Sequence, residues 1–209
     1  RYISVTGVQT CALPICGRVL KNVTGLDLCK LLTGSHGTLG IITEVTLKVL
    51  PAPDSSATLV LHGLDAVAGV RALSAGLGSP FGVSAAAWMP AESTALVPAL
   101  AGGKSAALLR IEDFATSVVY RIDRLRDLLG GTASVLDAAI SRQVWQAVGD
   151  AAPLPRQASD AVWRVSVRPS AGPAVLAACG LSGFLDWGGG LVWLAGPADA
   201  ATHASVEAA

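Results

Sequence analysis

A glycine-rich loop between an expected helix and an expected strand is the segment best suited to ligand chemistry. Residues 34–42 read Gly-Ser-His-Gly-Thr-Leu-Gly-Ile-Ile. Gly37 and Gly40 have no Cβ, so the backbone there can turn sharply and approach a ligand closely. Successive backbone N–H groups in such a loop can point at a pyrophosphate, and the Thr38 hydroxyl can donate to a phosphate. Spacing alone leaves two interpretations open, a phosphate-binding loop and an ordinary structural turn.

Arginines on expected strands are the candidate anion-binding side chains. Arg110 lies in a strand expected at 106–112, and Arg164 lies in a strand expected at 161–167. Strand alternation places Arg164, Ser166 and Arg168 on the face opposite Trp163. A guanidinium binds a carboxylate through two parallel hydrogen bonds, so Arg110 and Arg164 are the candidate substrate contacts. The alternative is a solvated strand face with ordinary surface ion pairs.

No residue presents itself as a general base or nucleophile. His62 and His203 lie in unremarkable contexts and are expected at the surface, and His36 is expected to face solvent. Cys29 and Cys179 have apolar neighbours and are expected as buried thiols. The tryptophans are expected to fill a core or an interface rather than stack on a planar cofactor: Trp88, Trp145, Trp163, Trp187 and Trp193. The catalytic residues therefore stay unassigned.

Cysteine spacing and charge exclude several classes of function. The four cysteines form no CxxC pair, which excludes a Cys-rich zinc or iron–sulfur site built from this chain alone and fits a reduced cytosolic setting. Lys+Arg 15 balances Asp+Glu 15, which gives no electrostatic reason for a nucleic-acid or anionic-membrane partner. Mean hydropathy is +0.55, yet no run approaches the roughly 18 apolar residues of a spanning helix. A hydrophobic face that docks onto a partner subunit would raise hydropathy in the same way.

Hydrophobic periodicity predicts an α+β chain with an antiparallel sheet covered by helices. A short strand at 18–22 and a helix at 28–32 precede the glycine-rich loop, and a strand at 41–50 follows it. Pro51 and Pro53 end that strand, which indicates a domain boundary near 51–56. Further strands are expected at 57–62, 82–88, 106–112, 134–136, 161–167, 184–187 and 191–194, the last two as a hairpin with a glycine-rich turn. Helices are expected at 65–75, 114–129, 138–148 and 171–178, with another beginning near the C-terminal end.

The glycine-rich loop and the residues before it resemble the flavin-domain signature of the vanillyl-alcohol oxidase/para-cresol methylhydroxylase-type FAD family. That signature reads Asn-x-x-Gly-aromatic-Asp, then Leu, then Gly-Ser-x-Gly-Thr-Leu-Gly-Ile. The chain matches it from Asn22 to Ile42 and departs at Leu26, where an aromatic residue is usual, and at His36. The resemblance implies FAD as cofactor. It also implies these cofactor-facing residues: Asn22, Thr24, Gly25, His36, Gly37, Thr38, Leu39, Gly40, Ile41 and Ile42.

Later segments resemble the cap domain of the FAD-binding subunits of glycolate oxidases. These segments are residues 109–112, 163–169 and 186–194, and the whole resemblance runs from about residue 17 to 195. It implies a subunit that works with a second flavin subunit and an iron–sulfur subunit, in the cytoplasm or peripherally at the inner membrane through those partners. The implied reaction is oxidation of glycolate to glyoxylate. Two alternatives stay open, a dehydrogenase of another 2-hydroxy acid such as D-lactate, and a non-catalytic assembly or electron-relay subunit.

The resemblance divides the chain into three parts. Residues 17–53 correspond to the C-terminal piece of the FAD-binding domain and residues 54–209 to a cap domain that is expected to be truncated at its end. Residues 1–16 resemble translated adapter sequence and are expected to be non-native, the alternative being an ordinary N-terminal strand. Nothing before residue 17 supplies the earlier glycine-rich loop that holds the FAD phosphates in this family. The chain alone is therefore expected to bind FAD weakly or not at all.

Overall fold

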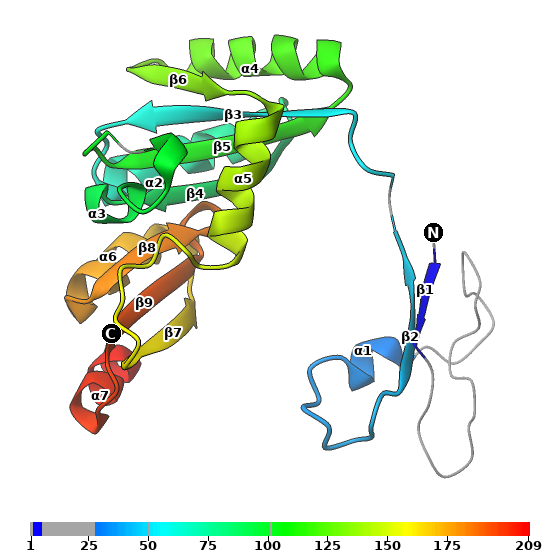
Figure 1. The fold of residues 1–209 in the computed structure, drawn as a ribbon, viewed down its shortest axis with the longest axis vertical. Coiled ribbons are helices and arrows are strands. Elements are labelled where there is room, and N and C mark those ends of the chain that lie inside the picture. The colour runs from blue at the N-terminus through cyan, green and yellow to red at the C-terminus, as the bar shows by residue number, and fades with distance from the viewer. Residues whose placement is uncertain (1, 6–27, 50, 101) are drawn as a thin grey trace. The chain divides into compact units, whose positions relative to one another are not determined.

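The computed structural model describes residues 2–5, 28–49, 51–100 and 102–209. The strand predicted at 18–22 and the candidate cofactor residues Asn22, Thr24 and Gly25 lie outside the described residues. The chain divides into two compact units, Arg1–Ala52 and Pro53–Ala209 (Figure 1).

The first unit contains one antiparallel strand pair and one short helix. Strand β1 (Tyr2–Val5) pairs with β2 (Glu44–Lys48), and α1 (Cys29–Leu32) precedes the glycine-rich loop. The strand predicted at 41–50 is shorter than expected, because the pairing with β1 reaches only from Glu44 to Lys48. Cys29 is exposed, so the prediction of a buried thiol there is wrong. That residues 1–16 are non-native stays a prediction.

The second unit is built on a seven-stranded sheet whose strand order is β6-β3-β5-β4-β8-β9-β7. All its strand pairs are antiparallel, which confirms the predicted α+β class. The strands are β3 (Ser55–His62), β4 (Val83–Met89), β5 (Ala106–Asp113), β6 (Ala133–Leu136), β7 (Asp160–Ser166), β8 (Ser182–Asp186) and β9 (Leu191–Pro197). The sequence predicted each of these strands to within about three residues of its ends, because most of them are short, mainly apolar runs between turn-forming segments.

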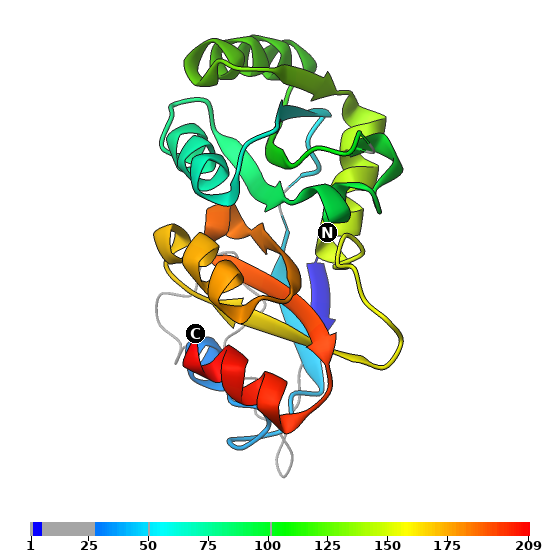
Figure 2. The same cartoon turned by 90° about the vertical axis from the view of Figure 1, so that its left-hand side faces the viewer.

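Helices cover both faces of this sheet. They are α2 (Ala66–Leu77), α3 (Ala91–Thr94), α4 (Ala115–Leu129), α5 (Ala138–Gly149), α6 (Gly172–Cys179) and α7 (Ala200–Ala208), with 3₁₀ turns η1 (Pro98–Leu100), η2 (Pro169–Ala171) and η3 (Trp187–Gly189). Aspartates begin three of them, since the carboxylates of Asp65, Asp137 and Asp199 accept hydrogen bonds from first-turn amides. Figure 2 shows α2 and α6 on one side of the sheet and α5 on the other.

Two hydrophobic cores follow from this arrangement, one on each face of the sheet. Leu59 and Leu109 pack with α2 and α4 on the first face, and Val60 and Leu108 pack with α5 on the second. The helix predicted at 114–129 begins one residue later, at Ala115, and Phe114 before it is 72% exposed. Trp187, expected in a core or an interface, is 58% exposed and belongs to neither core.

Candidate functional site

A cavity of about 380 Å³ is lined by residues from the ends of α2 and α5, from β4 and β5, and from the turn after β8. Its lining includes Ser84, Arg110, Trp145, Asp186, Trp187 and Gly188. A volume of this size is at the lower end of that of ligand pockets, and a few polar groups within an apolar wall are typical of them. The cavity thus offers one cation, one carboxylate and two indole rings to a small molecule.

Arg110 lines the cavity beside an irregularity in the neighbouring strand β4. In β5 it lies opposite Thr58 of β3 on one side and Ala85 of β4 on the other. The β4 register shifts between Val83 and Ala85, and a bulge of this kind redirects side chains. Ser84, which lies within the shift, accepts a hydrogen bond from Arg110 Nε at 3.3 Å and donates one to the Arg110 carbonyl at 3.3 Å. The bulge therefore ties Ser84 to both the side chain and the backbone of Arg110.

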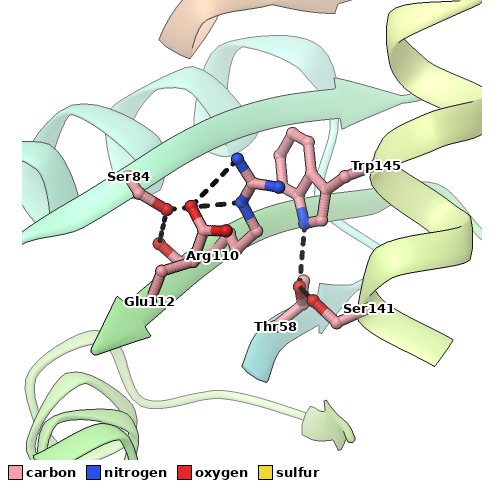
Figure 3. A network of polar contacts seen from close by, with 6 residues as sticks. All are labelled: Thr58, Ser84, Arg110, Glu112, Ser141 and Trp145. Carbon is pink, nitrogen blue, oxygen red and sulfur yellow. Dashed lines mark hydrogen bonds and ion pairs between the residues drawn. The ribbon is translucent and has the colours of Figure 1, made fainter. Parts of the chain in front are cut away.

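Arg110 and Trp145 belong to one network of polar contacts (Figure 3). The Arg110 guanidinium carbon lies 5.2 Å from the centroid of the Trp145 ring, and Arg110 Nη2 lies 3.1 Å from Glu112 Oε2. The Trp145 indole N–H donates to Thr58 Oγ1 at 2.8 Å, and the Thr58 and Ser141 hydroxyls lie 2.7 Å apart. Thr58 and Ser141 are fully buried, and Trp145 is buried as well. The network fixes the plane of an indole that forms one wall of the cavity.

Arg164 has different surroundings from Arg110. It lies on the edge strand β7 opposite Trp193 of β9, and it is exposed. Its guanidinium carbon lies 4.7 Å from the centroid of the Trp187 ring and 5.9 Å from that of Trp193. Such cation–π contacts hold the guanidinium flat against the rings. Arg164 does not line the cavity, so the two predicted substrate residues share a face of the sheet but not a site.

Asp186 is the residue of the cavity that sequence reasoning did not single out. It ends β8, and its Oδ1 accepts a hydrogen bond from the Trp187 amide at 2.7 Å. Burial raises the pKa of the Asp186 carboxyl, while the Trp187 amide and the Arg164 charge oppose that rise. Trp187 has a positive φ of 52°, which turns the chain sharply after Asp186. An aspartate directly before Trp-Gly-Gly-Gly at a strand end was the available signal in the sequence.

The glycine-rich loop of the first unit has an open backbone. Gly37 has a φ of 80°, and a Cβ added there would meet nothing within 4 Å. In the part of the chain that the structure describes, no hydrogen bond engages the backbone N–H groups of Leu39, Gly40 and Ile41. The Thr38 hydroxyl donates to the Ser35 carbonyl at 2.7 Å, so the hydrogen bond to a phosphate predicted from the sequence is not available in this arrangement. Unpaired amides beside a bare glycine fit a loop that lies along a phosphate-bearing cofactor such as FAD.

Two of the three histidines, His62 and His203, lie outside both the cavity and the glycine-rich loop. His62 Nε2 lies 2.7 Å from Ser134 Oγ at the edge of the sheet. His203 lies in α7, where Nδ1 accepts from the Trp163 indole at 3.1 Å and Nε2 lies 3.3 Å from Glu207. His36 is exposed with a φ of 51°, as expected for a solvent-facing loop residue. Among the described residues, no group of three or more His, Cys, Asp or Glu side chains is arranged to hold a metal ion.

Known proteins resemble the chain in fold and, over short stretches, in sequence. No family model matches the chain. Its fold matches two solved structures of alkyldihydroxyacetonephosphate synthase with a TM-score of 0.61, at 15% and 14% identity, over 99% of this chain and 46% and 47% of those chains. At this identity the likeness shows the fold alone. Shorter sequence matches are to D-lactate dehydrogenase of Anaerostipes hadrus, 56% identical over 43 residues, and to glycolate oxidase subunit GlcD of Bacillus subtilis, 44% identical over 54 residues. The chain is thus related to the FAD-linked 2-hydroxy acid oxidoreductases.

A longer match makes this relationship more specific. The chain is a distant homologue of glycolate oxidase subunit GlcE of Escherichia coli, with 29% identity over 185 residues, or 88% of the chain. It spans 44% of the length of that subunit. Among the described helices, none is long and apolar enough to cross a membrane.

Proposed function

We propose that the chain is part of the FAD-binding subunit of a glycolate oxidase complex that oxidises glycolate to glyoxylate. The observation that carries this proposal is the relationship to subunit GlcE along most of the chain. Residues 17–53 would then belong to the FAD-binding domain and residues 54–209 to the cap domain. A second flavin subunit and an iron–sulfur subunit are the proposed partners, and the subunit would act in the cytoplasm or at the inner membrane through them.

The proposed cofactor site is the glycine-rich loop. His36, Gly37, Thr38, Leu39, Gly40, Ile41 and Ile42 would lie along FAD, together with Asn22, Thr24 and Gly25. The open backbone at Gly37 and the unpaired amides after it support this assignment. Bound there, FAD would supply the hydride acceptor, which is chemistry that no side chain can provide.

Oxidation of a 2-hydroxy acid also asks for a cation that holds the carboxylate and an acceptor for the hydroxyl proton. The sequence offered two candidate cations, Arg110 and Arg164, and Arg164 lies outside the cavity. Arg110 lines the cavity and is the proposed substrate-contacting cation, because a guanidinium suits a carboxylate in shape and charge. The cavity offers the Asp186 carboxylate as a hydrogen-bond acceptor for the hydroxyl. Arg110 and Asp186 thus supply both groups within one cavity.

Two other functions have specific support. A D-lactate dehydrogenase is favoured by the 56% identity to the Anaerostipes hadrus enzyme, although that match covers 21% of this chain. A non-catalytic assembly or electron-relay subunit is favoured by the histidines, because none of the described ones lies in the cavity. In that case the flavin would transfer electrons between partner subunits without contacting the substrate.

The test uses the full-length subunit from the same genomic locus, co-expressed with its neighbouring flavin and iron–sulfur subunits. We expect bound FAD and glycolate-dependent reduction of an artificial electron acceptor. Turnover of D-lactate without turnover of glycolate would replace glycolate as the substrate. FAD binding without turnover of either acid by any assembly would favour the electron-relay function. Turnover by the intact subunit in the absence of its partners would exclude a purely non-catalytic role.

A further inference from the structure

The two candidate arginines differ in how firmly they are held and in what they face. Arg110 lines the cavity and is bounded by Trp145, Ser84 and Glu112, whereas Arg164 lies outside it against two indoles. We infer that Arg110 is the carboxylate-binding group of the cavity, and that Trp145, oriented by Thr58, positions it. The inference rests on the proposed function for the identity of the acid.

Arg110 keeps hydrogen-bond donors for a ligand. A guanidinium carries five N–H groups. Nε donates to Ser84 Oγ and Nη2 pairs with Glu112, so among the described residues Nη1 keeps both its hydrogens. One face of the guanidinium is covered by Trp145, which confines a ligand to the edge. A carboxylate approaching that edge meets a fixed cation rather than a flexible one.

Arg164 lacks the corresponding surroundings. Its two ring contacts involve Trp187, which is exposed, and Trp193, whose indole nitrogen is buried without a hydrogen-bond partner among the described residues. A buried N–H cannot offer a second hydrogen bond to an anion at Arg164. The aromatic contacts of Arg164 therefore hold a strand edge together rather than build a binding site.

The Thr58 hydroxyl orients the Trp145 indole, and the indole in turn positions Arg110. Thr58 is fully buried in a strand whose next residues are Leu59, Val60 and Leu61, where an apolar side chain would be the usual choice. Its Oγ1 accepts from the Trp145 indole and lies 2.7 Å from Ser141 Oγ. Because Ser141 and Trp145 lie on successive turns of α5, the Thr58 hydroxyl fixes the helix face against the strand that neighbours Arg110. The order of contacts is then Thr58, Trp145, Arg110.

A substitution at Glu112 should strengthen ligand binding, whereas substitutions at Thr58 and Arg110 should weaken it. Its carboxylate lies 3.1 Å from Arg110 Nη2 and partly offsets the positive charge. If Arg110 binds a carboxylate, Glu112→Gln should strengthen binding, because a competing anion is removed while the shape stays the same. A side chain that only stabilises the fold would instead leave binding unchanged.

The first experiment is steady-state kinetics on the full-length complex. Thr58→Val should raise the KM for glycolate about tenfold, equivalent to about 1.4 kcal/mol of binding free energy, with kcat little changed. Thr58→Ser should restore the wild-type KM because it keeps the hydroxyl. Arg110→Gln should raise KM more than Thr58→Val, and Arg164→Gln, the matched control, should leave it close to wild type. Equal effects of Arg110→Gln and Arg164→Gln would overturn the inference.

A second experiment separates this inference from the proposed function. Acetate and glycolate are titrated into the 209-residue chain while the side-chain Nε–H signal of Arg110, assigned by its loss in Arg110→Gln, is followed by NMR. In the wild type and in Thr58→Ser, we expect the nearby Trp145 ring to shift the Arg110 signal. In Thr58→Val this ring-induced shift should be lost, and acetate should bind several-fold more weakly. Acetate binding with these variant effects, but no glycolate turnover, would sink the proposed function alone. If the Arg110 signal in Thr58→Val stays at its wild-type position, or if the wild-type chain does not bind acetate, the inference is wrong.

Discussion

The two units of the chain differ in how their residues are packed. None of residues 28–45, 47 and 49 is buried, and Leu39, Ile41 and Ile42 are exposed. In the sheet unit, Leu59, Leu108 and Leu109 are fully buried between strands and helices. The segment with the most specific sequence signature therefore has the least packing. This contrast supports the proposal that the loop contacts a cofactor, since its apolar residues are exposed and belong to no core.

The largest expected effect tests this contrast directly. Leu109→Ala should destabilise the sheet unit by about 2–5 kcal/mol, because it leaves a cavity among fully buried neighbours. Ile41→Ala, the matched change in the loop, should alter the main unfolding transition by less than about 0.5 kcal/mol. Urea unfolding followed by tryptophan fluorescence measures both. Similar losses from the two variants would contradict the contrast.

Glycine substitutions test the same difference in packing between the two units, with a smaller expected effect. A Cβ added at Gly69 of α2 meets the ring of the buried Trp88, so Gly69→Ala should lower the stability of the sheet unit by about 1–3 kcal/mol. At Gly37 an added Cβ meets nothing, and the φ of 80° strains the loop alone. Gly37→Ala should leave the main transition unchanged in thermal melts. A Gly37→Ala chain that melts with the Gly69→Ala chain would show that the two units unfold as one.

Helix capping gives a smaller effect. Asp137 accepts from the amides of Ala139 and Ile140 at the start of α5, whereas α1 of the first unit has no side-chain cap. Asp137→Ala should therefore cost about 1 kcal/mol, measured by urea unfolding. Asp137→Asn, which caps nearly as well, is the control. A loss as large in Asp137→Asn would assign the effect to charge instead of capping.

The smallest effect concerns pH. Burial raises the pKa of Asp186 above its unfolded value of 3.8, so the ionised carboxylate disfavours folding at neutral pH. That cost is relieved as pH falls through the folded pKa towards 3.8. Asp186→Asn keeps an oxygen for the Trp187 amide, so it should raise the melting temperature slightly at pH 7, and the gain should shrink below the folded pKa.

The pKa of Asp113, in the same unit, is shifted in the opposite direction to that of Asp186. The Phe114 amide lowers the pKa of its carboxyl, with smaller contributions from Ser117 and Arg121. Its stabilising contribution is present above 3.8 and is lost as pH falls through the folded pKa. Asp113→Asn should accordingly lower the melting temperature at pH 7. If both variants shift the melting temperature in the same direction, the environments assigned to the two carboxyls are wrong.

Local patterns predicted the elements of the sheet unit but not its site. Short windows of sequence show the apolar runs of β3 and β5. The site depends on long-range pairing, since Thr58 meets Trp145 across 87 residues and Ser84 meets Arg110 across a bulge. Short-range periodicity carries no record of either contact. The sequence placed Arg110 on its strand, but its separation from Arg164 required the strand order.

The open sheet also has two free edges, which bears on how the protein behaves at high concentration. Strand β6, at one edge, is four residues long, and β7, at the other, carries Arg164 and Asp160. Short or charged edge strands resist pairing with a strand from another molecule. The formal net charge is +0, so long-range repulsion between copies is weak. Protection against strand-to-strand aggregation therefore falls to these edges, and neutralising Arg164 would expose the longer one.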